Sequence, residues 1–178
     1  MYSSCCVVVL GPLARGYDSF YGLTRNAHNH FSKRMRGSAD WHLWNGTVLW
    51  DAPTDLKIDS QVSSTHEITE YASQKIEEHA ESKEPFVMMV AYTMPHDPLM
   101  VDTEYMDQSH RGATNCLTRF SNWRRQRYCA MVTCVDESVG NLTRLLKHHH
   151  MLHDTIIVFT SDNGGIALVR AVYCVYTV

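Results

Sequence analysis

The sequence lacks any apolar stretch approaching the about 20 residues that a membrane-spanning helix needs. It also lacks a basic excess: the net charge is -3, so neither a nucleic-acid partner nor an anionic membrane is indicated. Apolar residues are not scarce, because 44% of the chain is hydrophobic and 20% is charged, which argues against disorder. At 178 residues, the chain is expected to form one globular domain or part of one.

The six cysteines lack the spacing of a zinc site or of a compact disulfide scaffold. Cys129 and Cys134 fall within a predicted helix, where we interpret both as small buried thiols. The N-terminus lacks the basic residues of a signal peptide, so its apolar run at residues 7–10 favours a buried strand. Sequons at Asn45 and Asn141 matter only if the chain enters the secretory pathway.

Hydrophobic periodicity predicts two helices. Ser64 and Glu67 have the spacing of a capping box, and apolar residues then recur at helical spacing until Pro85 ends the pattern. A second helix is predicted from about Asn122 to His150, again with one apolar face. We interpret three arginines at its start as a solvated face: Arg124, Arg125 and Arg127.

Two short apolar segments predict strands. Phe86 to Tyr92 is a continuous apolar run that suits a strand buried on both faces, and Thr155 to Thr160 is rich in β-branched residues. Residues 11–64 show little periodicity and are expected to be mostly loop, apart from a short strand at Thr47 to Trp50. The order helix, strand, loop, helix, strand, loop predicts an α/β fold with a mostly parallel central sheet.

Polar residues follow both predicted strands, where ligands collect in α/β folds. Asp162 and Asn163 offer a carboxylate and an amide oxygen, which suit a hard cation such as calcium, although a plain turn is the alternative. His96 lies in a loop bracketed by prolines and could bind an anion or act as a general acid, although an ordinary loop histidine is the alternative.

A cluster of histidines lies at the end of the second predicted helix. It consists of His148, His149, His150 and His153. A metal site is one interpretation of such a cluster. We favour a structural role instead, because consecutive helical residues point in different directions and cations are favourable near a helix C-terminus.

Four segments, in order, resemble the arylsulfatase B branch of the sulfatase family. They are RGYDSFYG at residues 15–22, the strand and H-x-P-L-like loop at residues 86–105, the helix at residues 128–141, and VFTSDNGG at residues 158–165. The resemblance covers about residues 11–165. It divides the chain into a partial sulfatase catalytic domain, residues 1–165, and a divergent C-terminal tail, residues 166–178.

The resemblance implies an alkaline-phosphatase-like α/β sandwich that hydrolyses sulfate esters with a formylglycine nucleophile. It implies that Asp162 and Asn163 are calcium ligands, and that His96 contacts the sulfate and protonates the leaving oxygen. The substrate would be an aryl sulfate or a sulfated glycan such as a glycosaminoglycan. The implied location is the secretory pathway, lysosomal or extracellular.

The chain departs from the family pattern at the nucleophile. It contains no C/S-x-P-x-R motif, and Cys5 and Cys6 are followed by valines. The N-terminal pair of metal-binding aspartates is also missing, and calcium takes about six to eight oxygen ligands. Asp40 to Trp44 imitates the K-W-H-L-G motif but lacks its lysine and glycine, so we do not interpret His42 as an active-site histidine. We therefore expect no hydrolysis by this chain alone.

Two other functions stay open from the sequence. A related phosphodiesterase or phosphatase would tend to carry Asp-His-Gly, whereas this chain has Asp162, Asn163 and Gly164, which favours a sulfatase. A non-catalytic protein that binds a partner or a sulfated glycan is the second alternative. The lack of a basic patch weakens its glycan-binding form, because sulfated chains call for clustered lysine and arginine.

Overall fold

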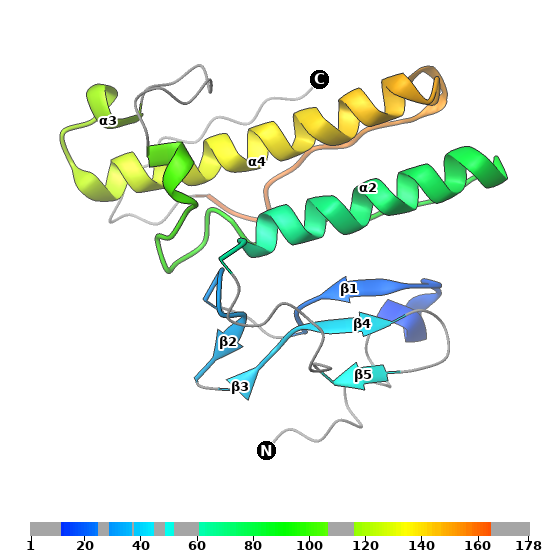
Figure 1. Cartoon of the computed structure of the whole chain (residues 1–178), viewed down its shortest axis with the longest axis horizontal. Helices are drawn as coiled ribbons and strands as arrows, with labels where there is room; N and C mark the ends of the chain where they lie inside the picture. Colours follow the sequence, from blue (N-terminus) through cyan, green and yellow to red (C-terminus); the bar gives the residue numbers. More distant parts are fainter. Residues whose placement is uncertain are drawn as a thin grey trace.

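The computed structural model describes residues 12–24, 29–36, 38–44, 49–51, 61–106 and 116–164. Two long helices lie side by side, and a small β region lies against one of them (Figure 1). The α-helices are α2 (Ser64–Ser82), α3 (Cys116–Arg119) and α4 (Trp123–His148). Three 3-10 turns complete the helical elements of this part of the chain: η1 (Pro12–Arg15), η2 (Thr103–Met106) and η3 (Leu152–Asp154).

Helix α2 begins and ends close to the predicted positions, but its start is not a capping box. The N-cap residue is Ser63, and its side chain makes no capping hydrogen bond. The Glu67 carboxylate instead lies 2.6 Å from Lys33 Nζ in a buried ion pair. At the other end, Lys83 takes the left-handed conformation and its N–H donates to the His79 carbonyl, so the helix ends before Pro85.

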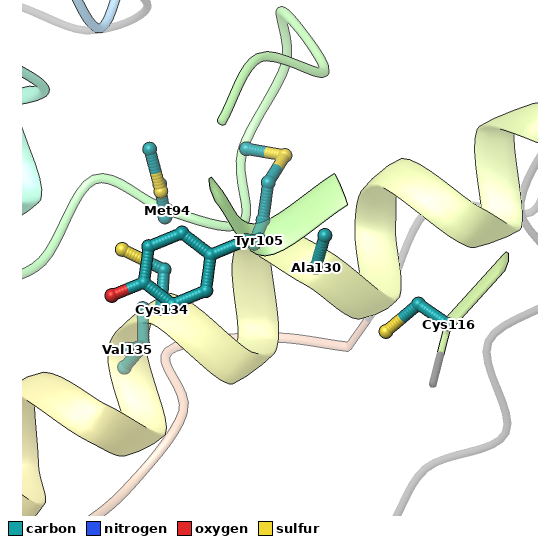
Figure 2. Packing of buried hydrophobic residues seen from close by; sticks show 7 residues of the cluster. Met94, Tyr105, Cys116, Ala130, Cys134 and Val135 are labelled. Atoms are coloured by element: carbon teal, nitrogen blue, oxygen red, sulfur yellow. The ribbon is translucent and has the colours of Figure 1, made fainter. Parts of the chain in front are cut away.

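Helix α4 confirms the second predicted helix almost residue for residue. Its N-cap is Asn122, whose side-chain oxygen accepts hydrogen bonds from the N–H groups of Arg124 and Arg125. The three arginines of the first turns are exposed, as predicted. The buried face of α4 packs on η2 and the loop before it, in a core of Met94, Tyr105, Cys116, Ala130, Met131, Cys134 and Val135 (Figure 2).

The cysteine interpretation is half confirmed. Cys134 is a free and fully buried thiol. Cys129 is not a free thiol, because it forms a disulfide with Cys116 that joins α3 to α4. The pair lies only 13 residues apart in sequence, but its Cα–Cα distance of 5.7 Å depends on how the chain folds back at the start of α4.

The observed sheets come from the region that was expected to be mostly loop, so that expectation is wrong for four of the five short strands. Strands β1 (Phe20–Gly22), β4 (His42–Trp44) and β5 (Leu49–Asp51) form an antiparallel sheet in the order β1-β4-β5. Strands β2 (Arg34–Met35) and β3 (Ser38–Ala39) form a separate antiparallel pair. Strand β5 overlaps the strand predicted at residues 47–50, of which residues 47 and 48 lie outside the described part.

The mostly parallel central sheet is not present among the described residues. Residues 86–92 return along α2 and residues 155–160 return along α4, but neither segment pairs with a strand there (Figure 1). Burial on both faces, which was predicted for residues 86–92, is also wrong: Val87 is 88% exposed and Met89 is 74% exposed. In residues 155–160, Ile156 and Val158 are 92% and 81% exposed. A strand exists only when a neighbour takes up its backbone hydrogen bonds, and no described segment does so here.

The β region is held against α2 by aromatic and polar contacts of Tyr21. Its ring stacks on Tyr71 at a centroid distance of 4.8 Å and meets Trp41 edge-on at 5.2 Å. Its hydroxyl donates to Glu67 Oε2 at 3.1 Å.

The predicted N-terminal strand and the tail at residues 166–178 lie outside the described residues. No described helix combines the length and apolarity that crossing a bilayer requires.

Candidate functional site

His96 lies on the exposed loop that follows residues 86–92. Its N–H donates to the Thr93 carbonyl at 3.0 Å, which forms a turn, and the neighbouring Met94 side chain is buried in the core. The His96 imidazole lies 2.7 Å, through Nδ1, from the carbonyl oxygen of Asp97. A carbonyl can only accept, so Nδ1 carries the proton, and Nε2 is the ring nitrogen that is not engaged in this contact.

A buried histidine from the β region holds this loop. The His30 Nε2 atom lies 3.0 Å from the His96 carbonyl oxygen, and its Nδ1 atom lies 3.1 Å from Thr93 Oγ1. Ser64, at the start of α2, adds a hydrogen bond of 2.9 Å to the same threonine hydroxyl. Its N–H also donates to the His30 carbonyl at 2.7 Å. The position of His96 is therefore set jointly by the β region and the first turn of α2.

The protonation state of His30 follows from these contacts. Because the His96 carbonyl only accepts, His30 donates from Nε2, and Nδ1 is left to accept from the Thr93 hydroxyl. Burial lowers the pKa of His30, against a smaller opposing effect of the hydrogen bond to His96. The neutral imidazole is therefore the form that fits this network.

Asp162 and Asn163 lie in an exposed turn beyond residues 155–160. The Ser161 hydroxyl donates to the Asn163 backbone carbonyl and closes the turn. Both side chains end in hard oxygen donors and face solvent, so their chemistry fits a calcium ion. They supply only part of the oxygen ligands that calcium takes, and further ligands would have to come from elsewhere.

The described structure does not bring the two parts of the predicted site into contact. No hydrogen bond or ion pair joins His96 to Asp162 or Asn163 within the described residues. His96, Asp162 and Asn163 were predicted to lie together at one edge of a parallel sheet. That sheet is not present in the described part of the chain.

His42 was not interpreted as an active-site histidine from the sequence, and the structure shows which contacts this side chain makes. It is buried in β4, and its Nε2 atom lies 2.9 Å from Asp40 Oδ1. The same carboxylate oxygen accepts from the N–H and the hydroxyl of Thr24 at 3.1 and 2.9 Å. Burial raises the pKa of Asp40, but the bonds from His42 and Thr24 outweigh it and the net pKa is about 2. This anchored carboxylate organises the β region.

Sequence reasoning missed His30, Thr93 and the side-chain role of Ser64. His30 stands in a segment without periodicity, and its partners at residues 93 and 96 are more than 60 positions away. No local pattern marks such a residue. The available signal was Ser64, because a hydroxyl at the start of a helix can also bond to another segment. From the sequence, this hydroxyl was assigned to helix capping instead.

Comparison with known proteins identifies the family. The family model described as Sulfatase matches residues 4–169. The chain is 30% identical over 158 residues to arylsulfatase J of Mus musculus, covering 86% of this chain and 24% of that protein. It is 26% identical over 164 residues to N-acetylgalactosamine-6-sulfatase of Homo sapiens, covering 90% and 28%. The chain thus spans roughly a quarter of the length of these relatives.

Solved structures share the arrangement of this chain. A complex of Ps i-CgsB with k-i-k-neocarrahexaose matches with a TM-score of 0.59 and 25% identity, over 80% of this chain and 31% of that one. Ps i-CgsB alone matches with a TM-score of 0.60 and 24% identity over the same shares, which supports the fold. Because the family model covers most of the sequence, and the ordered segments around His96 and Asp162 fall inside it, the chain belongs to the sulfatase family.

Proposed function

We propose that this chain is part of a sulfuric ester hydrolase and supplies a portion of its active site. The observation that carries the proposal is the His96 loop: the imidazole is exposed and its Nδ1 contacts the Asp97 carbonyl, while buried His30 holds the loop backbone. An exposed histidine on a held loop, with Nε2 outside that contact, suits an anionic substrate that must lose an oxygen leaving group.

Each residue has a distinct part in the proposed chemistry. His96 contacts the sulfate group through Nε2 and, when protonated, donates that proton to the departing oxygen. His30 remains neutral and keeps the His96 carbonyl, and so the loop, in place. Asp162 and Asn163 would hold a calcium ion, which when bound would offset the negative charge of the sulfate.

The proposed substrate class is a sulfated glycan or an aryl sulfate. N-acetylgalactosamine-6-sulfatase is among the relatives, and the Ps i-CgsB complex contains k-i-k-neocarrahexaose, so carbohydrate substrates occur among similar proteins. A secretory, lysosomal or extracellular location is proposed with it. The Cys116–Cys129 disulfide supports that location, because disulfides persist in oxidising compartments.

The isolated chain is proposed to be inactive. The sequence has no C/S-x-P-x-R motif from which a formylglycine could form, so the covalent step has no nucleophile. In this proposal, residues 1–165 form part of a sulfatase catalytic domain that needs the remaining strands and metal ligands, and residues 166–178 form a divergent tail.

The test uses a longer protein that contains this chain together with a formylglycine nucleophile. The transcript around this segment is sequenced, and any longer product with an upstream C/S-x-P-x-R motif is produced with its cysteine or serine converted to formylglycine. We expect that protein to hydrolyse an aryl sulfate and a His96→Gln variant to lose about 100-fold or more in kcat. His79→Gln, which changes a histidine on α2, is the matched control and should keep activity.

Two results would contradict the proposal. Turnover of an aryl sulfate by the purified 178-residue chain would show that it needs no formylglycine nucleophile. Unchanged kcat in the His96→Gln variant of the longer protein would remove His96 from the reaction.

A further inference from the structure

Three side chains of types that can ligate a metal converge between α2 and α4, and none of them is a residue of the candidate site described above. They are His66 on the first turn of α2, Asp102 just before η2, and Cys134 in the middle of α4. One ligand atom from each lies within 4.8 Å of the ligand atoms of the other two. Residues from three separate elements therefore meet at one point beside the hydrophobic core.

The Asp102 carboxylate has an oxygen that the protein leaves without a good hydrogen bond. Its buried Oδ2 atom has no hydrogen-bond partner of acceptable geometry, although it lies 3.2 Å from His66 Nδ1. The same His66 Nδ1 lies 3.1 Å from Ser63 Oγ, a contact that a bound metal would replace. The Asp102 side chain is 14% exposed and the His66 side chain 29%, whereas Cys134 is fully buried. A buried carboxylate oxygen that is close to a charge partner but poorly bonded is well placed to accept a cation.

The surroundings of this point are negatively charged and contain another polar group. Besides Asp102, the carboxylates of Glu104 and Glu137 lie close enough to act electrostatically on both His66 and Cys134, and this negative charge favours a cation. The Tyr105 hydroxyl lies 3.2 Å from His66 Nε2 and points toward the Cys134 sulfur (Figure 2). It can orient the thiol and the imidazole, because groups that hydrogen-bond to metal ligands commonly fix the direction of those ligands.

We propose that His66, Asp102 and Cys134 form a binding site for a divalent cation of the zinc type. Imidazole nitrogen, thiolate sulfur and carboxylate oxygen are the ligands that zinc prefers, whereas calcium takes oxygen alone. The site is therefore chemically distinct from the calcium site proposed at Asp162 and Asn163. Three protein ligands leave a fourth position, which water can fill.

Binding requires a small closure of the cluster and the loss of a proton. Ligand atoms in a tetrahedral zinc site lie about 3.5 Å apart, given bonds of about 2.0 to 2.3 Å, so the widest pair must approach by about 1 Å. His66 and Asp102 are partly exposed and can make that adjustment. The S–H bond of Cys134 breaks as the metal–sulfur bond forms, and the proton is released to the solvent. The bound ion then links α2, α4 and the segment before η2.

The test uses Co²⁺ as a spectroscopic substitute for Zn²⁺. Co²⁺ is titrated into the full 178-residue chain with Cys5, Cys6 and Cys174 replaced by serine, so that Cys134 is the thiol available beside the Cys116–Cys129 disulfide. We expect saturable binding of one ion with thiolate-to-cobalt charge-transfer absorption. Cys134→Ala should abolish that absorption, and His66→Gln or Asp102→Asn should each weaken binding by about 100-fold or more.

The histidines after α4 provide the control for adventitious binding. Lys147, His150, Leu152 and His153 line a shallow cavity of about 390 Å³ that could hold a metal nonspecifically. A His150→Gln/His153→Gln variant should keep the charge-transfer absorption and its affinity. Circular dichroism of each variant without metal checks folding, and Asp102→Asn, on a partly exposed side chain, serves if Cys134→Ala does not fold.

The outcomes separate cleanly. Charge-transfer absorption that is lost in Cys134→Ala and retained in the His150→Gln/His153→Gln variant supports the site, as does a gain of helical signal when Co²⁺ is added. The proposal is overturned if the chain gives no charge-transfer absorption, or if binding persists in Cys134→Ala and disappears when His150 and His153 are replaced.

Discussion

The Lys33 ammonium lies 2.6 Å from the Glu67 carboxylate, and the two side chains are 0% and 1% exposed. Lys33 also donates to the Val62 carbonyl at 3.0 Å, and Glu67 accepts from the Tyr21 hydroxyl at 3.1 Å. These contacts join the β region to the first turns of α2, the same turns that support the His96 loop through Ser64.

Removing the Glu67 charge is expected to destabilise the chain strongly. Glu67→Gln leaves the Lys33 ammonium buried without its carboxylate, which costs about 3–5 kcal/mol in the free energy of unfolding. Urea unfolding measures this loss. The matched control is Glu78→Gln, which breaks the exposed Lys75–Glu78 pair and should cost less than about 1 kcal/mol. Equal small losses in both variants would show that the buried pair does not hold the β region to α2.

The disulfide is expected to contribute measurable stability. Cys116 and Cys129 close a loop with a sequence separation of 13, and a loop of that size gains about 3 kcal/mol from the cross-link. Adding a reductant should lower the free energy of unfolding of the wild-type chain by that amount, seen as a lower urea midpoint. A Cys116→Ala/Cys129→Ala variant should start at the lower midpoint and show no further response to reductant; an unchanged wild-type midpoint would argue against the bond.

His30 is expected to make stability depend on pH. Its folded-state pKa is lowered from 6.5 by burial, so below pH 6.5 the unfolded chain binds a proton that the folded chain does not. The stability contributed by neutral His30 is complete above that pH and is lost as the pH falls toward the folded-state pKa. The slope from one proton is at most about 1.4 kcal/mol per pH unit.

Comparison of variants isolates this His30 effect. His30→Gln should be less stable at neutral pH and should lose less stability than wild type when urea unfolding is repeated at about pH 5.5. His153→Gln, at an exposed position, should retain the wild-type slope. Identical slopes for wild type and His30→Gln would mean that His30 is not the group that titrates.

The exposed apolar segment at residues 155–160 is expected to limit solubility. Ile156, Val158 and Phe159 are 92%, 81% and 65% exposed, and the segment has no strand partner among the described residues. Such an edge promotes association with other chains. Val158→Lys should raise the concentration at which light scattering first detects aggregates and should change the free energy of unfolding by less than about 0.5 kcal/mol.

The control for that experiment adds the same charge elsewhere. Gln74→Lys changes an exposed residue on α2 and gives the same net charge without removing apolar surface. If both lysine variants improve solubility equally, net charge and not the segment at residues 155–160 is responsible.

Local sequence was sufficient for the two long helices. Apolar periodicity, Asn122 as N-cap and the stop before Pro85 are properties of neighbouring residues, and α2 and α4 lie where these signals predict them. The ordered family segments were also local patterns, and the sulfatase family match agrees with them. The buried thiol of Cys134 was predicted from its place in a helical stretch, although the same interpretation was wrong for Cys129.

Partners across the chain were decided by the tertiary structure. Glu67 had the spacing of a capping residue, yet it pairs with Lys33. The reason is that burying an unpaired ammonium costs more free energy than leaving a helix N-terminus without a side-chain cap. His30 reaches the His96 loop, Cys116 reaches Cys129, and His66, Asp102 and Cys134 meet from three elements. The segments at residues 86–92 and 155–160 have the composition of strands, but a strand needs a neighbour to complete its backbone hydrogen bonds. Composition and periodicity describe what one segment prefers, whereas pairing depends on which segments the whole fold brings together.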